Sequence, residues 1–158
     1  MPSAKKETER KFLVKNKDYR TFARPVYFCQ GYLNDDPERT VRIRTAGEKA
    51  YLTVKGKTIG ISRIEYEYEI PVEDAEIMLK SLCLHPLIEK YRYTVPQGEL
   101  NWEIDEFLGE NEGLIIAEIE LPDESYSFEL PDWIGKEVSG DPNYYNVNLI
   151  KNPYKNRE

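Results

Sequence analysis

The 158-residue sequence contains one histidine and two cysteines, and this scarcity excludes several kinds of site. Without a second histidine, nothing in the sequence supports a zinc site or a serine triad. Cys29 and Cys83 stand far apart with no Cys-x-x-Cys pairing, so we expect reduced core residues. His85 precedes Pro86, which favours a turn or a strand entry over a catalytic role. Any catalysis must therefore depend on carboxylates, basic groups and a hard cation.

Long apolar runs and an excess of positive charge are also missing. No apolar stretch approaches the roughly 20 residues of a membrane span, and residues 1–6 lack the apolar core of a signal peptide. We therefore expect a cytoplasmic protein with no membrane partner. The net charge of −7 argues against a nucleic-acid partner, for which a basic face is expected. With 40% hydrophobic residues, the chain can bury the core of one domain spanning 1–158.

What the sequence does have is charge at every second residue of several strand-like segments. In the first, Glu7-Thr-Glu9-Arg-Lys11, two carboxylates and an ammonium would project from one face of an extended strand. Like charges held side by side repel, so such a face favours water or a bound cation between the carboxylates. The spacing recurs in six further segments, at Arg42 and Arg44; Thr53 and Lys55; Arg63, Glu65 and Glu67; Lys90 and Arg92; Glu103 and Asp105; and Glu118 and Glu120.

The alternate positions of these segments are mostly apolar, which for one strand alone would suit the solvated side of an antiparallel sheet. Within most segments, however, the charges share one sign, whereas an ordinary surface mixes them. The separate acidic and basic strands therefore indicate two walls of one site. A closed barrel would make these walls face each other, with helices covering its apolar exterior. We predict an α+β fold: an eight-stranded antiparallel β-barrel around a charged, hydrophilic tunnel, with helices packed on the outside. The strands are expected at about 5–14, 26–33, 39–46, 49–56, 60–71, 87–96, 99–107 and 113–122.

Helical segments are expected outside these strands. Residues 72–82 carry an apolar stripe at helical spacing, which predicts a helix on the barrel exterior. A short helix is expected near 18–22, and residues 123–130 form either a short helix or an irregular turn. Asp141-Pro142 is typical of an N-cap followed by the first helical position, so a last helix should run to about Lys151.

The ordered motifs resemble those of the CYTH, or triphosphate tunnel metalloenzyme, superfamily, whose hallmark is an N-terminal Glu-x-Glu-x-Lys motif. The resemblance covers nearly the whole chain, through Glu7-x-Glu9-x-Lys11, 30–33, Arg42-Ile-Arg44, 52–55, 60–67, 89–93, Glu103-Ile-Asp105 and Glu118-Ile-Glu120. The series is specific for the superfamily and much less so for the reaction of one member. The chain is similar overall to short bacterial inorganic triphosphatases.

A triphosphate carries about four to five negative charges near neutral pH, and Arg and Lys side chains hold phosphate by bidentate hydrogen bonds and point charge. The candidate triphosphate-binding residues are Lys11, Arg42, Arg44, Lys55, Arg63, Lys90, Arg92 and Lys136. Lys136 joins them because the family often keeps a basic residue near the tunnel mouth in this part of the chain. Trp133 beside it is interpreted as an anchor for the C-terminal segment, and Tyr32 either reaches the tunnel or packs in the core.

Paired carboxylates without a nearby histidine suit Mg²⁺ or Mn²⁺, which take oxygen ligands and bridge phosphate oxygens. As the family counterparts imply, the candidate metal ligands are Glu7, Glu9, Glu118 and Glu120. The candidate catalytic residues are Glu65, Glu67 and Lys90. The two glutamates either complete a second metal site or orient the attacking water.

The leading functional hypothesis is metal-dependent hydrolysis of inorganic tripolyphosphate or a similar small triphosphate. The chief alternative is a class IV adenylate cyclase, but such cyclases usually carry a His-Phe pair upstream of the first motif, where this chain has Met1-Pro2. A non-catalytic polyphosphate or nucleotide-binding module should lose metal ligands, yet all four candidates are glutamates. Thiamine and nucleoside triphosphates remain open as substrates, and the oligomeric state is open, a homodimer included.

Overall fold

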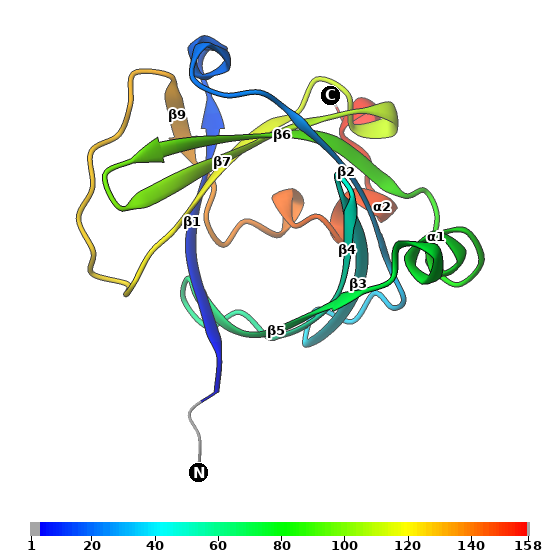
Figure 1. Ribbon diagram of the computed structural model, residues 1–158. Helices are drawn as coiled ribbons and strands as arrows, with labels where there is room; N and C mark the ends of the chain where they lie inside the picture. Colours follow the sequence, from blue (N-terminus) through cyan, green and yellow to red (C-terminus); the bar gives the residue numbers. More distant parts are fainter. Residues whose placement is uncertain (1–3, 158) are drawn as a thin grey trace.

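The computed structural model describes residues 4–157, in which eight antiparallel strands close into a barrel (Figure 1). The strands are β1 (Lys6–Val14), β2 (Val26–Tyr32), β3 (Arg39–Ala46), β4 (Lys49–Gly56), β5 (Ser62–Ile70), β6 (Ile88–Gln97), β7 (Leu100–Phe107) and β8 (Ile115–Glu120). Neighbouring strands follow the order β5, β4, β3, β2, β6, β7, β8, β1, and pairing of β1 with β5 closes the ring. The predicted eight-stranded antiparallel barrel is confirmed.

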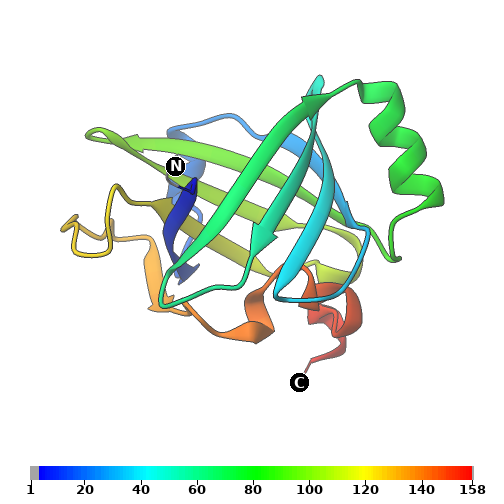
Figure 2. The same cartoon turned by 90° about the horizontal axis from the view of Figure 1, so that it is seen from below.

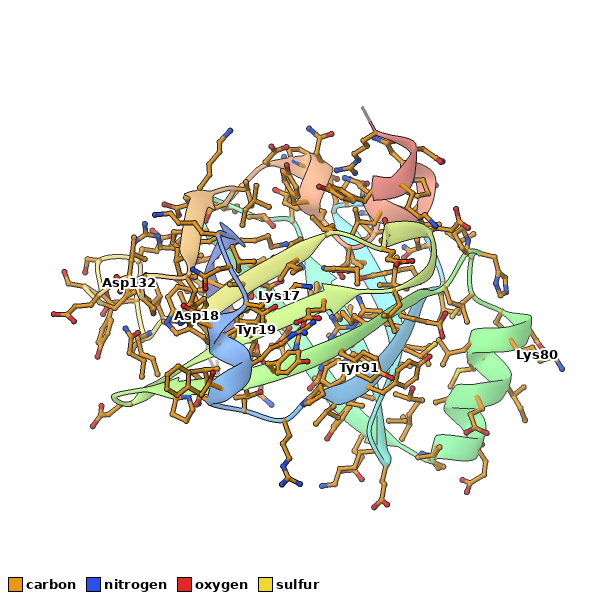
Figure 3. The ribbon with its side chains drawn as sticks, turned by 90° about the horizontal axis from the view of Figure 1, so that it is seen from above. Lys17, Asp18, Tyr19, Lys80, Tyr91 and Asp132 are labelled. Atoms are coloured by element: carbon orange, nitrogen blue, oxygen red, sulfur yellow. The ribbon has the colours of Figure 1, made fainter. Side chains whose placement is uncertain are left out.

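Part of the hydrophobic core lies outside the barrel wall, because the apolar side chains of β6, β7 and β8 point outward. Trp102 and Tyr19 both pack there against Trp133, which follows β8 in the chain. Tyr19 belongs to the 3₁₀ helix η1 (Asp18–Thr21) (Figure 3). Trp133 makes edge-to-face contacts, with ring centroids 5.5 Å from those of both Trp102 and Tyr19. Burying three large aromatic rings in one cluster fixes the segment around Trp133 on the barrel, as predicted.

The helix α1 (Val72–Ser81) covers another part of the exterior (Figures 1 and 2). Its buried residues Ala75 and Leu79 pack on Ile43 of β3 and Ala50 of β4, as the helical stripe predicts. Among residues 4–157, no helix has the length and apolar character needed to cross a lipid bilayer.

The C-terminal part differs from the prediction. A ninth strand, β9 (Ile134–Glu137), pairs with β1 outside the ring. The continuous helix predicted from Asp141-Pro142 to Lys151 is wrong, because extended backbone at Tyr145 (φ −71°, ψ 130°) separates η3 (Pro142–Tyr144) from α2 (Asn148–Lys151). Residues 123–130 form an irregular turn, which was one of the two alternatives. The remaining short helices are η2 (Gly109–Asn111) and η4 (Tyr154–Asn156).

Candidate functional site

The barrel encloses a cavity of about 240 Å³ with a mainly charged lining. Seven basic and seven acidic side chains line it: Lys11, Arg42, Arg44, Lys55, Arg63, Lys90 and Arg92, and Glu7, Glu9, Glu65, Glu67, Glu103, Glu118 and Glu120. Every predicted site residue except Lys136 is therefore brought to one cavity, and Glu103 joins them.

The two signs of charge are separated around the ring. The adjacent strands β4, β3, β2 and β6 form a basic wall that carries Lys55, Arg42, Arg44, Lys90 and Arg92. The adjacent strands β7, β8 and β1 form an acidic wall that carries Glu103, Glu118, Glu120, Glu7 and Glu9, with Lys11 as its one basic member. β5 carries both signs and closes the ring. A ligand with negative charges and bound cations would meet complementary charge on both sides.

Lys136 does not join this site. It lies exposed on β9 and is not part of the cavity lining. Since β9 pairs with β1 as an extra strand outside the ring, the structure gives no support to the predicted phosphate contact. Tyr32, by contrast, both lines the cavity and is buried, and its hydroxyl accepts a hydrogen bond of 2.9 Å from Gln30 Nε2.

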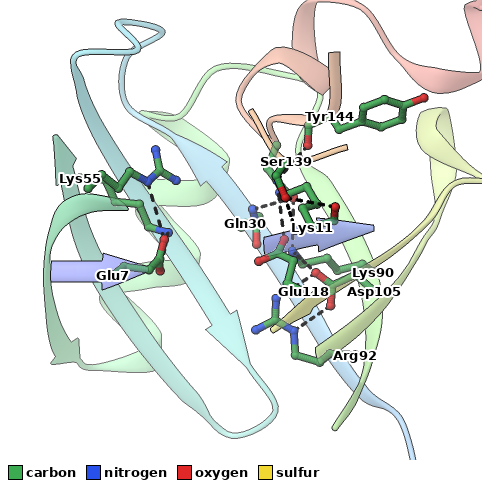
Figure 4. A network of polar contacts seen from close by, with 12 residues as sticks. Glu7, Lys11, Gln30, Lys55, Lys90, Arg92, Asp105, Glu118, Ser139 and Tyr144 are labelled. Atoms are coloured by element: carbon green, nitrogen blue, oxygen red, sulfur yellow. Dashed lines mark hydrogen bonds and ion pairs between the residues drawn. The ribbon is translucent and has the colours of Figure 1, made fainter. Parts of the chain in front are cut away.

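The segment after β9 covers one end of the cavity and is seen within the ring in Figure 1 and along one end of the barrel in Figure 2. Lys11 Nζ donates a hydrogen bond of 3.1 Å to the backbone oxygen of Tyr144 (Figure 4). Asn146 Oδ1 accepts hydrogen bonds from Lys90 Nζ at 3.2 Å and from Gln30 Nε2 at 3.3 Å. The break in the predicted C-terminal helix therefore lets Asn146 contact the tunnel interior.

Solvent exposure differs between the two ends. The side chains of Lys90 and Asp105, beside Asn146, are 2% and 1% exposed. Those of Glu67 and Glu103 are 33% and 38% exposed. We call the end with Lys90, Asp105 and Asn146 the covered end, and the end with Glu67 and Glu103 the open end. Of these four charged side chains, those at the open end are therefore the more accessible to solvent.

Arg42 and Arg44 on the basic wall share one counter-ion. The same carboxylate oxygen of Glu67 lies 3.3 Å from Arg42 Nη2 and 3.4 Å from Arg44 Nη2, and it also accepts a 2.8 Å hydrogen bond from Thr53. The Nε atoms of both arginines are buried and have no hydrogen-bond partner within the described chain. Burial and the neighbouring guanidinium groups of Arg42 and Arg92 lower the pKa of Arg44 to about 10. This pair therefore retains positive charge and free donors for an anion.

Asp105 is the buried counter-ion of two other basic residues (Figure 4). Its carboxylate lies 2.8 Å from Lys90 Nζ and 2.7 Å from Arg92 Nε. Burial alone would raise the pKa of Asp105, but the charges of Arg92 and Lys90 outweigh it and hold that pKa well below its usual value. Burial lowers the pKa of Lys90 to about 8 although Asp105 opposes the shift. No role for Asp105 was predicted from the sequence; the available signal was its two-residue spacing from Glu103.

The carboxylates of the acidic wall are crowded. Glu9 lies directly opposite Glu120 in the β1–β8 pairing, and Glu118 lies opposite Glu103 in the β7–β8 pairing. Burial and then the charges of Glu118 and Glu7 raise the pKa of Glu9 well above its usual value. Basic partners relieve part of this repulsion, as Lys11 lies 3.7 Å from Glu118. A bound cation would relieve more of it.

The donor set fits Mg²⁺ or Mn²⁺ shared with a ligand better than a metal held by protein alone. Within residues 4–157, no three acidic side chains converge closely enough to hold a metal ion. Mg²⁺ is usually bound through one or two carboxylates together with phosphate oxygens and water, so it does not need such a cluster. Glu7, Glu9, Glu118 and Glu120 are suitable for this arrangement.

Glu9→Gln tests the crowding directly. In excess chelator, we expect this variant to melt higher than wild type, because one of several adjacent carboxylates loses its charge. A gain of about 1 kcal/mol corresponds to roughly 2–4 °C for a chain of this size. The gain should grow as pH rises above the ordinary glutamate range, since the folded wild type must then release a proton from a crowded site.

Thermal melting of both proteins in chelator, and again with Mg²⁺ and tripolyphosphate, measures this effect. The variant should gain less from the ligands than wild type does, because it has lost a candidate cation ligand. Glu76→Gln, at an exposed position of α1, is the matched control. It should change neither the melting temperature in chelator nor the increase caused by Mg²⁺ and tripolyphosphate. A metal-free Glu9→Gln protein that melts well below wild type would identify Glu9 as a structural partner.

A closed barrel with facing acidic and basic walls defines a protein with a charged tunnel, and comparison with known proteins gives its family. The CYTH domain family matches residues 5–154, and the chain therefore belongs to the CYTH family. The chain is 58% identical over 151 residues to an inorganic triphosphatase from Acetivibrio thermocellus, covering 96% of this chain and 97% of that protein.

Solved structures agree with this assignment. The inorganic triphosphatase NE1496 matches with a TM-score of 0.64 and 31% identity, over 90% of this chain and 96% of that one. A putative adenylate cyclase from Bacillus halodurans matches with a TM-score of 0.58 and 16% identity, over 75% of this chain and 83% of that one. The second likeness concerns the fold alone. The predicted superfamily membership is confirmed.

Proposed function

We propose that this protein hydrolyses inorganic tripolyphosphate, or a similar small triphosphate, with the help of Mg²⁺ or Mn²⁺. The observation that carries the proposal is the buried pair Arg42 and Arg44, which share one carboxylate and keep donors without a partner among residues 4–157, opposite an acidic wall. The activity named for two relatives, at 58% and 31% identity, supports the same reaction. We also propose a cytoplasmic location, on the sequence argument given above.

The charge of the cavity supports the need for a divalent metal. Its lining has as many acidic as basic side chains. A triphosphate adds about four to five negative charges, so the lining alone cannot neutralise it. A divalent cation held by Glu7, Glu9, Glu118 and Glu120 would supply the missing positive charge, polarise the phosphoryl group and favour a water nucleophile.

The basic side chains would bind and orient the substrate. Guanidinium groups match phosphate oxygens bidentately, which suits Arg42 and Arg44 for the phosphate that faces the basic wall. Lys90, at the covered end, would contact a second phosphate from its position beside Asn146. These fixed charges would stabilise the negative charge that spreads over the phosphoryl group in the transition state.

Water would attack the terminal phosphorus, the bond to the bridging oxygen would break, and orthophosphate and pyrophosphate would result. Glu65 is the better of the two candidate carboxylates for orienting this water. Its carboxylate lies 3.0 Å from Lys55, whereas Glu67 already contacts Thr53 and both β3 arginines. Glu67 is therefore better suited to positioning those arginines.

The test is a panel of tripolyphosphate, ATP and thiamine triphosphate, each incubated with Mg²⁺, with Mn²⁺ and with excess chelator. Orthophosphate, pyrophosphate and cyclic nucleotide are measured separately. We expect release of orthophosphate from tripolyphosphate only when a metal is present. Undiminished release in chelator would contradict the metal role. Cyclic AMP and pyrophosphate from ATP, with tripolyphosphate intact, would establish a cyclase, and tight binding without any product would establish a binding module.

A further inference from the structure

Phe28 is a large apolar side chain on the inner face of β2, where the polar groups of Gln30 and Tyr32 follow at the same spacing. β2 lies between β3 and β6 in the sheet, so Phe28 has Arg44 on one flank and Arg92 on the other. The guanidinium carbons of these arginines lie 5.0 Å and 4.6 Å from the ring centroid. Phe28 is 8% exposed and is not part of the cavity lining, whereas both arginines are. Any effect of the ring on a ligand must therefore pass through the arginines.

The two arginines differ in how they are neutralised. Arg92 is bound by Asp105 at 2.7 Å and by Glu103 at 2.9 Å. Within the described chain, the carboxylate contact of Arg44 is the one at 3.4 Å to Glu67, which Arg42 shares. Arg44 is thus a buried cation beside two like charges with less than one carboxylate to hold it.

An aromatic ring suits this position for a physical reason. The negative face of the ring attracts a cation through its quadrupole, and the attraction strengthens when water is excluded. Unlike a carboxylate, the ring neither cancels the charge nor occupies the N–H donors. A guanidinium held in this way is fixed in place yet keeps its charge and donors for a ligand.

We infer that Phe28 is a positioning residue, which holds Arg44 at a set distance from Arg92 so that the two guanidinium groups receive one phosphate of the substrate. The inference rests on the proposed function, because it takes the ligand to be a triphosphate. It places this phosphate toward the open end, since Arg92 binds the exposed Glu103 and Arg44 contacts the exposed Glu67.

Phe28→Leu is the test, because leucine keeps an apolar side chain and removes the ring face. We expect KM for tripolyphosphate to rise about 30-fold, as the loss of a desolvated cation–π contact implies, with kcat within about twofold. Phe28→Trp and Phe28→Tyr, which keep a ring, should have KM values near that of the wild type. A ring that merely filled space would give no such difference between leucine and tyrosine.

Phe12→Leu is the matched control. Phe12 is also buried, and the guanidinium carbon of Arg10 lies 5.3 Å from its ring centroid, but the residue belongs to the core cluster outside the barrel. This variant should lose stability comparable to Phe28→Leu and keep the wild-type KM. Equal KM values for the two leucine variants would overturn the inference.

Calorimetric binding of tripolyphosphate in metal-free buffer separates the two proposals. If wild type binds but does not hydrolyse tripolyphosphate, the proposed activity fails, and a weaker dissociation constant for Phe28→Leu alone would still support the positioning role. If wild type hydrolyses tripolyphosphate and the affinities of wild type and Phe28→Leu agree, the positioning role fails and the activity stands. Wild type that neither binds tripolyphosphate in metal-free buffer nor hydrolyses it with Mg²⁺ would overturn both.

Discussion

Glu118→Gln is expected to reduce kcat for tripolyphosphate at least about 100-fold while leaving KM unchanged or lower. Glu118 is a candidate cation ligand, and loss of such a ligand weakens both the charge stabilisation and the placement of the nucleophile. The same change removes the carboxylate that lies 3.7 Å from Lys11. Lys11 would then offer its full charge to phosphate, so substrate capture should not suffer.

Arg42→Ala and Arg44→Ala should have the opposite effect, and weaken substrate binding more than turnover. Each removes a buried guanidinium with an unpartnered Nε, so substrate affinity should fall by the equivalent of about 2–5 kcal/mol, the usual cost of breaking a buried charged contact. Calorimetry measures capture, and phosphate release measures turnover. Glu137→Gln is the control, because its carboxylate pairs with Arg10 on β1 and does not line the cavity. If Glu118→Gln retained wild-type kcat, Glu118 would not be a cation ligand.

The barrel could be predicted from the sequence because its interior is charged. In most proteins, alternation places polar residues in solvent, so it does not distinguish an open sheet from a closed one. Here Arg42 and Arg44 share one face of β3, whereas Glu118 and Glu120 share one face of β8, and same-sign charges on separate strands require opposing walls. The register that places Glu9 opposite Glu120 could not be predicted, because it depends on strand pairing between distant parts of the chain.

The covered end of the site was not predictable for a related reason. Asp141-Pro142 does begin a helical turn, and the Asp141 side chain accepts a hydrogen bond from the backbone N–H of Asn143. Local signals do not reveal that the turn stops at Tyr145, because the break is stabilised by tertiary contacts of Asn146 with Gln30 and Lys90. Phe28 looks like an ordinary core residue in the sequence, since only the assembled barrel brings two arginines to its ring.

Asp105→Asn is expected to destabilise the protein by about 3–5 kcal/mol, the range found when one partner of a buried ion pair is removed. Asp105 is 1% exposed and forms ion pairs with both Lys90 and Arg92, so loss of its charge leaves two buried cations. The carboxylate contact that Arg92 keeps is the one with Glu103, which is 38% exposed. Urea unfolding of the metal-free protein measures this loss. Removing Lys90 as well, in Asp105→Asn combined with Lys90→Met, should recover part of the stability, because a cation is then removed along with its anion.

Tripolyphosphate should rescue Asp105→Asn more than it stabilises wild type, because its negative charges replace the missing counter-ion and it binds the folded state preferentially. Glu106→Gln is the matched control on the same strand. Glu106 pairs with Arg20 and Tyr19 outside the barrel, so this variant should lose less stability and gain no extra rescue. Equal rescue of both variants would mean that tripolyphosphate does not bind beside Lys90 and Arg92. If Asp105→Asn had the same free energy of unfolding as wild type, Lys90 and Arg92 would need no buried counter-ion.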